Sequence, residues 1–97
     1  MNIKEKYKEI LIDIITKYLP NSKIYLFGSR ATQTHHEGSD IDLALDNKEK
    51  IELKIIFKIQ DEIEQTSIPL FVDIVDINTT SEKLKNEILK EGILWKN

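Results

Sequence analysis

The chain has 97 residues, of which 40% are hydrophobic and 32% are charged, and 17 acidic residues against 14 basic ones give a net charge of −3. This composition is ordinary for a globular protein and excludes collagen-like, disordered and membrane-spanning classes. A chain of this size can bury roughly 65% of its extended surface, enough for one core, so we predict a single domain over residues 1–97.

The first elements are predicted from periodicity. Six apolar side chains between residues 3 and 19 share one helical face, and Pro20 follows them, so we predict a helix that ends there. Residues 23–27 are rich in strand-forming side chains and end at Gly28, which predicts a short strand. Residues 32–39 show no periodicity and are predicted to form a loop.

Two further strands and a helix are predicted in the middle of the chain. Residues 40–45 alternate, with Ile41, Leu43 and Leu45 on one face, which indicates a strand with one apolar side. Residues 48–65 carry isoleucines four positions apart and predict a second amphipathic helix. Residues 70–77 are strongly strand-forming, and we expect them to be the central strand.

The last third of the chain predicts a helix and a short strand. Thr79 and Glu82 fit a capping box that opens the helix, and Gly92 stands just beyond its end. Residues 93–95 are predicted to form the strand. The whole order, α, β, β, α, β, α, β, indicates an α/β (α+β) fold with a small mixed β-sheet and helices packed mainly on one face.

Several classes of partner and site are disfavoured. The chain has no cysteine, which excludes disulfides, thiolate metal sites and a cysteine nucleophile. It has no basic excess, so we expect no direct contact with nucleic acid. It also lacks an apolar stretch long enough for a bilayer and the apolar region of a signal peptide. We therefore expect a cytoplasmic protein with no membrane contact.

A phosphate-binding turn is predicted at the end of the first strand. Gly28 allows close approach of a ligand to the backbone, and Ser29 is a good helix N-cap that also offers a hydroxyl. A helix start presents free N–H groups, which suit a phosphate. Arg30 adds a cation that contacts the phosphate or pairs with a surface acid.

Three aspartates predict a metal site. Asp40 and Asp42 stand two positions apart on one strand, so their carboxylates leave the same face about 6.6 Å apart. Asp73 lies inside an apolar run, where a carboxylate must be paired, protonated or bound to metal. If the two strands are neighbours, Asp73 joins the other two acids. Because two charges about 4 Å apart repel by roughly 4 kcal/mol, we expect at least one raised carboxylate pKa without metal.

These residues together resemble a known family. Gly28-Ser29, ten intervening residues, then Asp40-Ile41-Asp42 with Asp73 on a later strand, resemble the nucleotidyltransferase fold of the DNA polymerase beta superfamily. The length and the runs Gly28-Ser29-Arg30-Ala31 and Ser39-Asp40-Ile41-Asp42-Leu43 are similar to its smallest branch, the minimal nucleotidyltransferase (MNT) domains. The resemblance extends nearly to the end of the chain, through Glu91-Gly92-Ile93-Leu94.

The resemblance implies an enzyme and a partner. Gly28, Ser29 and Arg30 would bind the phosphates of ATP, and Asp40, Asp42 and Asp73 would hold two Mg²⁺ ions. Asp73 would also help to deprotonate the attacking hydroxyl. Family members often act as antitoxins that transfer AMP to a tyrosine of a HEPN-type toxin, which implies a hetero-oligomer with such a protein.

Other interpretations stay open at this stage. The chain could act on the hydroxyl of a small molecule, although 97 residues leave little room for an acceptor site. It could also neutralise a toxin by contact without catalysis. The loop before Asp40 carries His35 and His36 where related loops often carry Gly and Arg, and we interpret this pair as a solvated loop rather than a zinc site. Asp76 is interpreted as a capped strand end, on the opposite face from Asp73.

Overall fold

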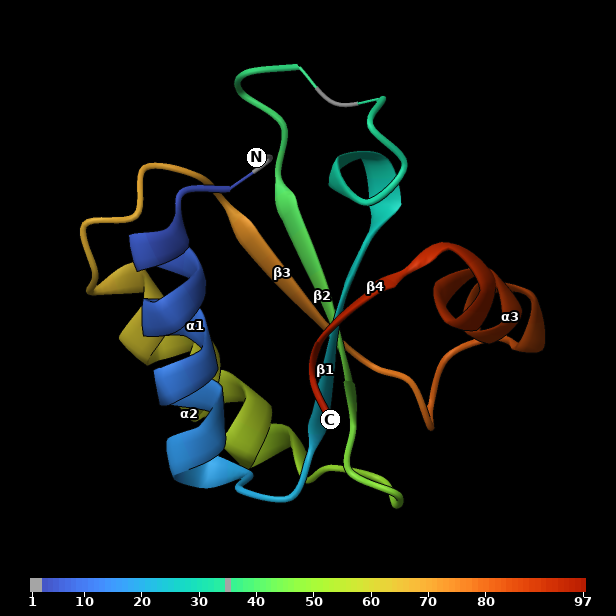
Figure 1. Cartoon of the computed structure of the whole chain (residues 1–97). Coiled ribbons are helices and arrows are strands. Elements are labelled where there is room, and N and C mark those ends of the chain that lie inside the picture. Colours follow the sequence, from blue (N-terminus) through green and yellow to red (C-terminus); the bar gives the residue numbers. More distant parts are fainter. Residues whose placement is uncertain (1–2, 35) are drawn as a thin grey trace.

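A four-stranded mixed sheet forms the centre of the computed structural model, which describes residues 3–34 and 36–97 (Figure 1). The strands lie in the order β3, β2, β1, β4. Strand β1 is antiparallel to both β2 and β4, and β2 is parallel to β3. The strand bounds are Lys23–Phe27 for β1, Ile41–Asp46 for β2, Val72–Asp76 for β3 and Ile93–Lys96 for β4.

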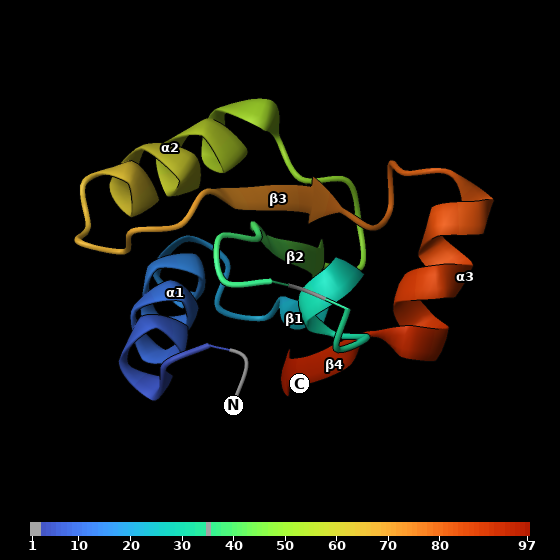
Figure 2. The same cartoon turned by 90° about the horizontal axis from the view of Figure 1, so that it is seen from above.

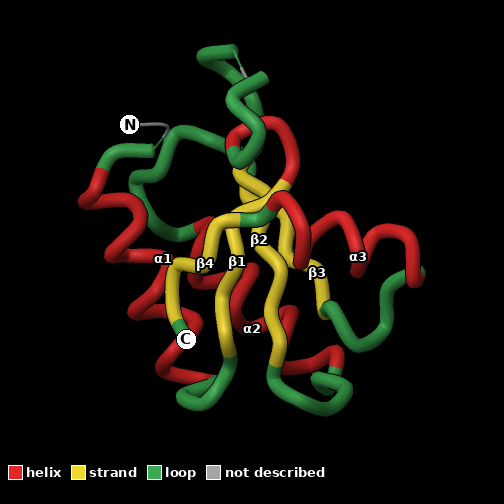
Figure 3. Tube along the Cα trace, turned by 45° about the vertical axis from the view of Figure 1, so that its right-hand side comes forward, coloured by secondary structure: helices red, strands yellow, loops and turns green. Residues whose placement is uncertain are grey.

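The helices cover the sheet unequally. Helices α1 (Glu5–Tyr18) and α2 (Leu53–Glu64) pack on one face, and α3 (Glu82–Glu91) lies on the other side (Figure 2). A three-residue 3₁₀ turn, η1 (Gly28–Arg30), follows β1 directly. The loop after η1 rises above the end of the sheet before the chain enters β2 (Figure 3). The prediction of a small mixed sheet with helices mainly on one face is confirmed.

The alternation in β2 explains why the main core forms where it does. Ile41, Leu43 and Leu45 are fully buried against α1 and α2. The alternate positions of β2 face α3, where Ala44 packs with Ile88 in a second, smaller cluster. Helix α3 therefore covers only part of its face of the sheet, and the remainder carries the polar ends of β2 and β3.

The prediction of a central position for residues 70–77 is wrong. Strand β3 lies at the edge of the sheet, and β2 and β1 occupy its middle. Strand propensity measures how well side chains fit a half-buried pleated surface, and it carries no information about the order of strands. The burial of β3 agrees with an edge, because Asp73 is exposed.

The start of α2 lies later than predicted. Residues 48–52 precede the helix, and Ile51 is buried while its backbone N–H donates to Asp76 Oδ2 at 2.8 Å. Asp76 Oδ1 also accepts from the N–H of Asn78 at 2.9 Å. Asp76 is thus a capping residue on the α2 side of the sheet, as expected, and its two bonds fix the chain on either side of it.

The predicted capping box of α3 is also wrong. Ser81 is the N-cap, and its side chain accepts from the N–H of Leu84 at 3.2 Å. The hydroxyl of Thr79 instead donates to the carbonyl of Asp76, in the turn that leaves β3. Gly92 follows α3 as predicted, but in an extended conformation, and a Cβ there would lie 2.4 Å from the carbonyl oxygen of Ile88.

Among the described residues, no helix is both long enough and apolar enough to cross a membrane.

Candidate active site

The parallel pairing of β2 with β3 brings two of the predicted acids together. Asp42 and Asp73 are direct partners in the ladder, so their Cα atoms are neighbours at the usual strand spacing of about 4.8 Å. Both stand on the face opposite the main core, because Ile41 and Val72 beside them belong to that core. This register confirms that Asp73 lies beside Asp42, whereas Asp40 stands outside the paired residues.

The three acids differ in their exposure. Asp42 is half-buried, whereas Asp73 on the edge strand is exposed. Asp40 is also exposed, and it stands one residue before β2 begins. The site is therefore open to solvent on the side of β3 and closed on the side of β1.

The charge of Asp42 is unfavourable in this setting. Burial raises the pKa of the Asp42 carboxyl above its ordinary value, and the negative charges of Asp73 and then Asp40 raise it further. The expected raised carboxylate pKa is thus found at Asp42. A carboxylate that is half-desolvated and faces two other acids is stabilised by a bound cation.

Gly28 is required by the geometry of the site. Its φ angle is +74°, in the left-handed region that side chains rarely adopt. A Cβ at this position would lie 2.5 Å from Asp42 Oδ2. The backbone of the turn therefore passes close to the Asp42 carboxylate, and the predicted phosphate-binding turn lies beside the predicted metal ligand.

The turn after Gly28 is shorter than a helix. Gly28–Arg30 form a single 3₁₀ turn, and Phe27 rather than Ser29 stands at its N-cap position. The N–H groups of Ala31 and Thr32 both donate to the carbonyl of Gly28. Ser29 is half-buried at the middle of this turn, next to the Gly28 backbone that contacts Asp42.

Arg30 holds the loop that leads to Asp40. Only 4% of its surface is exposed. Its Nε and Nη2 atoms donate to the carbonyl of Ser39 at 3.0 and 2.9 Å, and Nη2 also donates to that of Glu37 at 3.3 Å. The guanidinium thus ties η1 to the residues just before β2. These bonds favour a positioning role for Arg30 over a direct contact with phosphate, a distinction that the sequence could not make.

Two further polar residues of the loop are exposed to solvent. His36 and Glu37 are exposed, and the His36 ring lies 3.3 Å from the Ser39 hydroxyl. His35 lies outside the described residues. This part of the loop agrees with the interpretation as a solvated segment.

The donor set fits a hard divalent cation that is shared with a phosphate ligand. Within residues 3–34 and 36–97, no group of three or more histidine or acidic side chains is gathered tightly enough to hold a metal alone. Mg²⁺ does not need such a cage, because it commonly takes one or two carboxylates and completes its shell with water and substrate phosphates. Asp42 with Asp73 or Asp40 can supply these carboxylates, and the Gly28 turn lies beside Asp42.

Comparisons with known proteins point the same way. A family model described as "Polymerase beta, Nucleotidyltransferase" matches residues 9–96. The curated protein "Probable protein adenylyltransferase MntA" from Haemophilus influenzae is 28% identical over 90 residues, which cover 93% of this chain and 79% of that protein.

Solved structures are similar over most of the chain. A toxin–antitoxin structure with AMP-PNP matches with 25% identity and a TM-score of 0.77, over 91% of this chain and 71% of that one. A complex of tri-AMPylated Shewanella oneidensis HEPN toxin with an MNT antitoxin matches with 20% identity and a TM-score of 0.74, over 96% and 71% of the two chains. At 20% identity, the similarity to the second structure shows a shared fold only. With a family model that spans nearly its whole length and acids placed as described, the chain belongs to the polymerase beta nucleotidyltransferase family.

Proposed function

We propose that this chain is a Mg²⁺-dependent nucleotidyltransferase that transfers AMP from ATP to a tyrosine hydroxyl of a HEPN-type toxin, and thereby acts as its antitoxin in the cytoplasm. The observation that carries the proposal is the register of Asp42 with Asp73, next to a glycine turn whose backbone approaches Asp42. Phosphoryl and nucleotidyl transfer need carboxylates that hold metal ions, next to backbone that can bind phosphate.

Each residue has a proposed role. Gly28 and Ser29 bind the β- and γ-phosphates, the former because it leaves the backbone bare and the latter through its hydroxyl. Asp40, Asp42 and Asp73 would hold two Mg²⁺ ions, which when bound neutralise phosphate charge and increase the acidity of a nearby hydroxyl. Arg30 keeps the loop before Asp40 in place through its bonds to Ser39 and Glu37.

The bond changes follow from this placement. The acceptor oxygen attacks the α-phosphorus in line, a new O–P bond forms, and the bond to the bridging oxygen breaks as pyrophosphate leaves. Asp73 is exposed at the sheet edge, so an incoming hydroxyl can reach it, and its carboxylate accepts the proton. Asp42 is half-buried and faces the Gly28 turn, so its proposed role is on the triphosphate side of the reaction.

The partner is proposed from the relatives. The relatives include a protein adenylyltransferase and antitoxins in complexes with a HEPN toxin. In such a complex the partner protein itself presents the hydroxyl, and the two chains form a hetero-oligomer.

Intact-mass spectrometry tests the transfer directly. The chain is mixed with a HEPN partner, ATP and Mg²⁺, and the partner is expected to gain the mass of one or more AMP groups. Asp73→Asn is expected to bind ATP yet lose the transfer, whereas Glu64→Gln, on the exposed end of α2, is expected to behave as wild type. An unmodified partner after prolonged reaction with wild type would overturn the proposed activity.

A growth assay separates catalysis from neutralisation by contact. The variant with Asp40→Asn and Asp42→Asn is expected to form the complex and fail to protect cells from the toxin. Continued protection would show that binding alone neutralises the partner.

A further inference from the structure

A hollow lies beside the Gly28 turn, between the end of β1 and one face of α3. We call it the α3 hollow, and it has a volume of about 280 Å³. Pockets that enclose a whole small molecule usually measure about 300–1,000 Å³, so the α3 hollow suits one part of a nucleotide. Residues that line it and carry the argument are Phe27, Gly28, Thr32, Leu84, Glu87 and Glu91.

The α3 hollow is continuous with the candidate active site. Gly28 lines it, and the same residue approaches Asp42 Oδ2 so closely that a Cβ would lie 2.5 Å away. Phe27 also lines it and pairs with Asp42 across the β1–β2 ladder. A ligand with phosphates at the Gly28 turn therefore lies at the wall of the hollow.

The wall that α3 contributes disfavours phosphate and favours a base. Phe27 of β1 and Leu84 of α3 provide apolar surface, and both pack against the same small hydrophobic cluster. Glu87 and Glu91 stand four positions apart on one side of α3, and both line the hollow. Carboxylates repel phosphates and can only accept hydrogen bonds. A flat aromatic ring that carries an amino group satisfies both kinds of wall.

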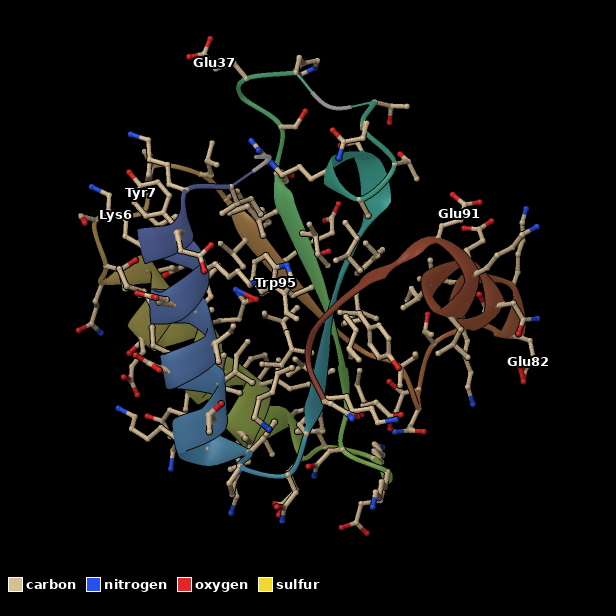
Figure 4. All side chains as sticks on the ribbon, viewed as in Figure 1. Lys6, Tyr7, Glu37, Glu82, Glu91 and Trp95 are labelled. Carbon is tan, nitrogen blue, oxygen red and sulfur yellow. The ribbon has the colours of Figure 1, made fainter. Side chains whose placement is uncertain are left out.

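We infer that the α3 hollow binds the base of the nucleoside triphosphate, and that Glu87 and Glu91 select a base with an exocyclic amino group, such as adenine. The inference rests on the proposed function, because it assumes that the phosphates lie at the Gly28 turn. It assigns α3 to nucleotide selection, whereas the sequence pattern of residues 83–91 alone is that of a solvated helix face. Figure 4 shows Glu91 at the end of α3 nearest η1, with Glu82 at the opposite end.

The test is calorimetric titration of the full chain with three ligands in the presence of Mg²⁺: ATP, purine riboside triphosphate, which lacks the amino group, and inorganic tripolyphosphate. Wild type is expected to bind ATP about tenfold more tightly than purine riboside triphosphate, as the loss of one net hydrogen bond implies. The double variant Glu87→Ala with Glu91→Ala is expected to bind the two equally. Glu82→Ala is the matched control, since it removes a carboxylate from the same helix outside the α3 hollow, and it should keep the preference.

The outcomes separate this inference from the proposed function. Tripolyphosphate affinity should be unchanged or higher in the double variant, because two repulsive charges are gone. A double variant that keeps the preference for ATP, or a wild type that shows none, would overturn the base assignment. Asp42→Asn should weaken the binding of all three ligands. If Asp42→Asn weakens the binding of none of them, the proposed metal site is wrong, and the base assignment is still judged by comparing ATP with purine riboside triphosphate. If wild type binds no triphosphate at all, the proposed function and the base assignment are both wrong.

Discussion

Asp42 is held where its charge costs stability. Burial and the neighbouring acids raise the pKa of its carboxyl above the ordinary 3.8. The folded protein therefore keeps this proton to a higher pH than the unfolded chain does. The contribution of the protonated form to stability is complete below the ordinary pKa and is lost as the pH rises through the raised pKa.

Asp42→Asn is accordingly expected to stabilise the protein at pH values above the raised pKa of Asp42. It is also expected to abolish metal-dependent nucleotide binding. About 1 kcal/mol shifts the melting temperature of a domain this size by roughly 4–8 °C, and solvent screening of a half-exposed group limits the gain to a fraction of that. Thermal melts of the variant and wild type at a series of pH values without Mg²⁺ measure this gain in stability. Identical pH profiles for the variant and wild type would show that Asp42 is not under this electrostatic strain.

Gly28 is the second residue whose substitution has a specific expected result. Gly28→Ala places a side chain in the left-handed region, at a cost of roughly 1–2 kcal/mol, and drives its Cβ into Asp42 Oδ2. We expect lower stability in urea and loss of nucleotide binding.

Gly38→Ala is the matched control for this substitution. Apart from its two chain neighbours, no described residue has a heavy atom within 4 Å of a Cβ at Gly38, and Gly38 is exposed. This variant should retain both stability and binding. Equal behaviour of the two variants would contradict the role assigned to the Gly28 turn.

At the scale of the elements, the loop between η1 and β2 depends on one buried side chain. Arg30→Lys keeps the charge but loses the fork that bonds to Ser39 and Glu37. Because bonds to charged groups contribute about 1.5–3 kcal/mol each, we expect a loss of about 2 kcal/mol. Amide hydrogen exchange within residues 31–40 should become faster, and exchange rates that match wild type would argue against this positioning role.

The elements also show what periodicity can and cannot predict. The alternation of β2 identified its buried face correctly, because Ile41, Leu43 and Leu45 all reached the core. Asp73 was found as a lone acid in an apolar run, and its pairing with Asp42 followed once β2 and β3 were neighbours. The order of strands was not predictable, since an edge strand and a central strand can carry the same side chains.

Local contacts explain the other differences. Thr79 and Ser81 are both good N-caps, and only the path of the chain out of β3 decides that Ser81 takes the role. The pairing of Ile51 with Asp76 keeps residues 48–52 out of α2 although their pattern is helical. The hydrogen bond from the Arg30 guanidinium to the Ser39 carbonyl connects residues that are nine positions apart, and no local sequence pattern predicts it.

At the scale of the whole molecule, stability and the candidate chemistry lie on opposite faces of the sheet. The face under α1 and α2 holds the larger hydrophobic cluster. The face toward α3 has a smaller cluster and leaves Asp42, Asp73 and the α3 hollow accessible. This arrangement allows substitutions among the acids without loss of the fold, so their effects on function can be measured separately.

The central claim is that the acids at the ends of β2 and β3 hold divalent ions together with a nucleoside triphosphate. Electron paramagnetic resonance of Mn²⁺, as a substitute for Mg²⁺, measures this directly in the presence of ATP. We predict that wild type and Glu64→Gln bind Mn²⁺ beyond the amount held by ATP alone, and that Asp42→Asn does not. Equal amounts of protein-bound Mn²⁺ in Asp42→Asn and wild type would contradict the claim.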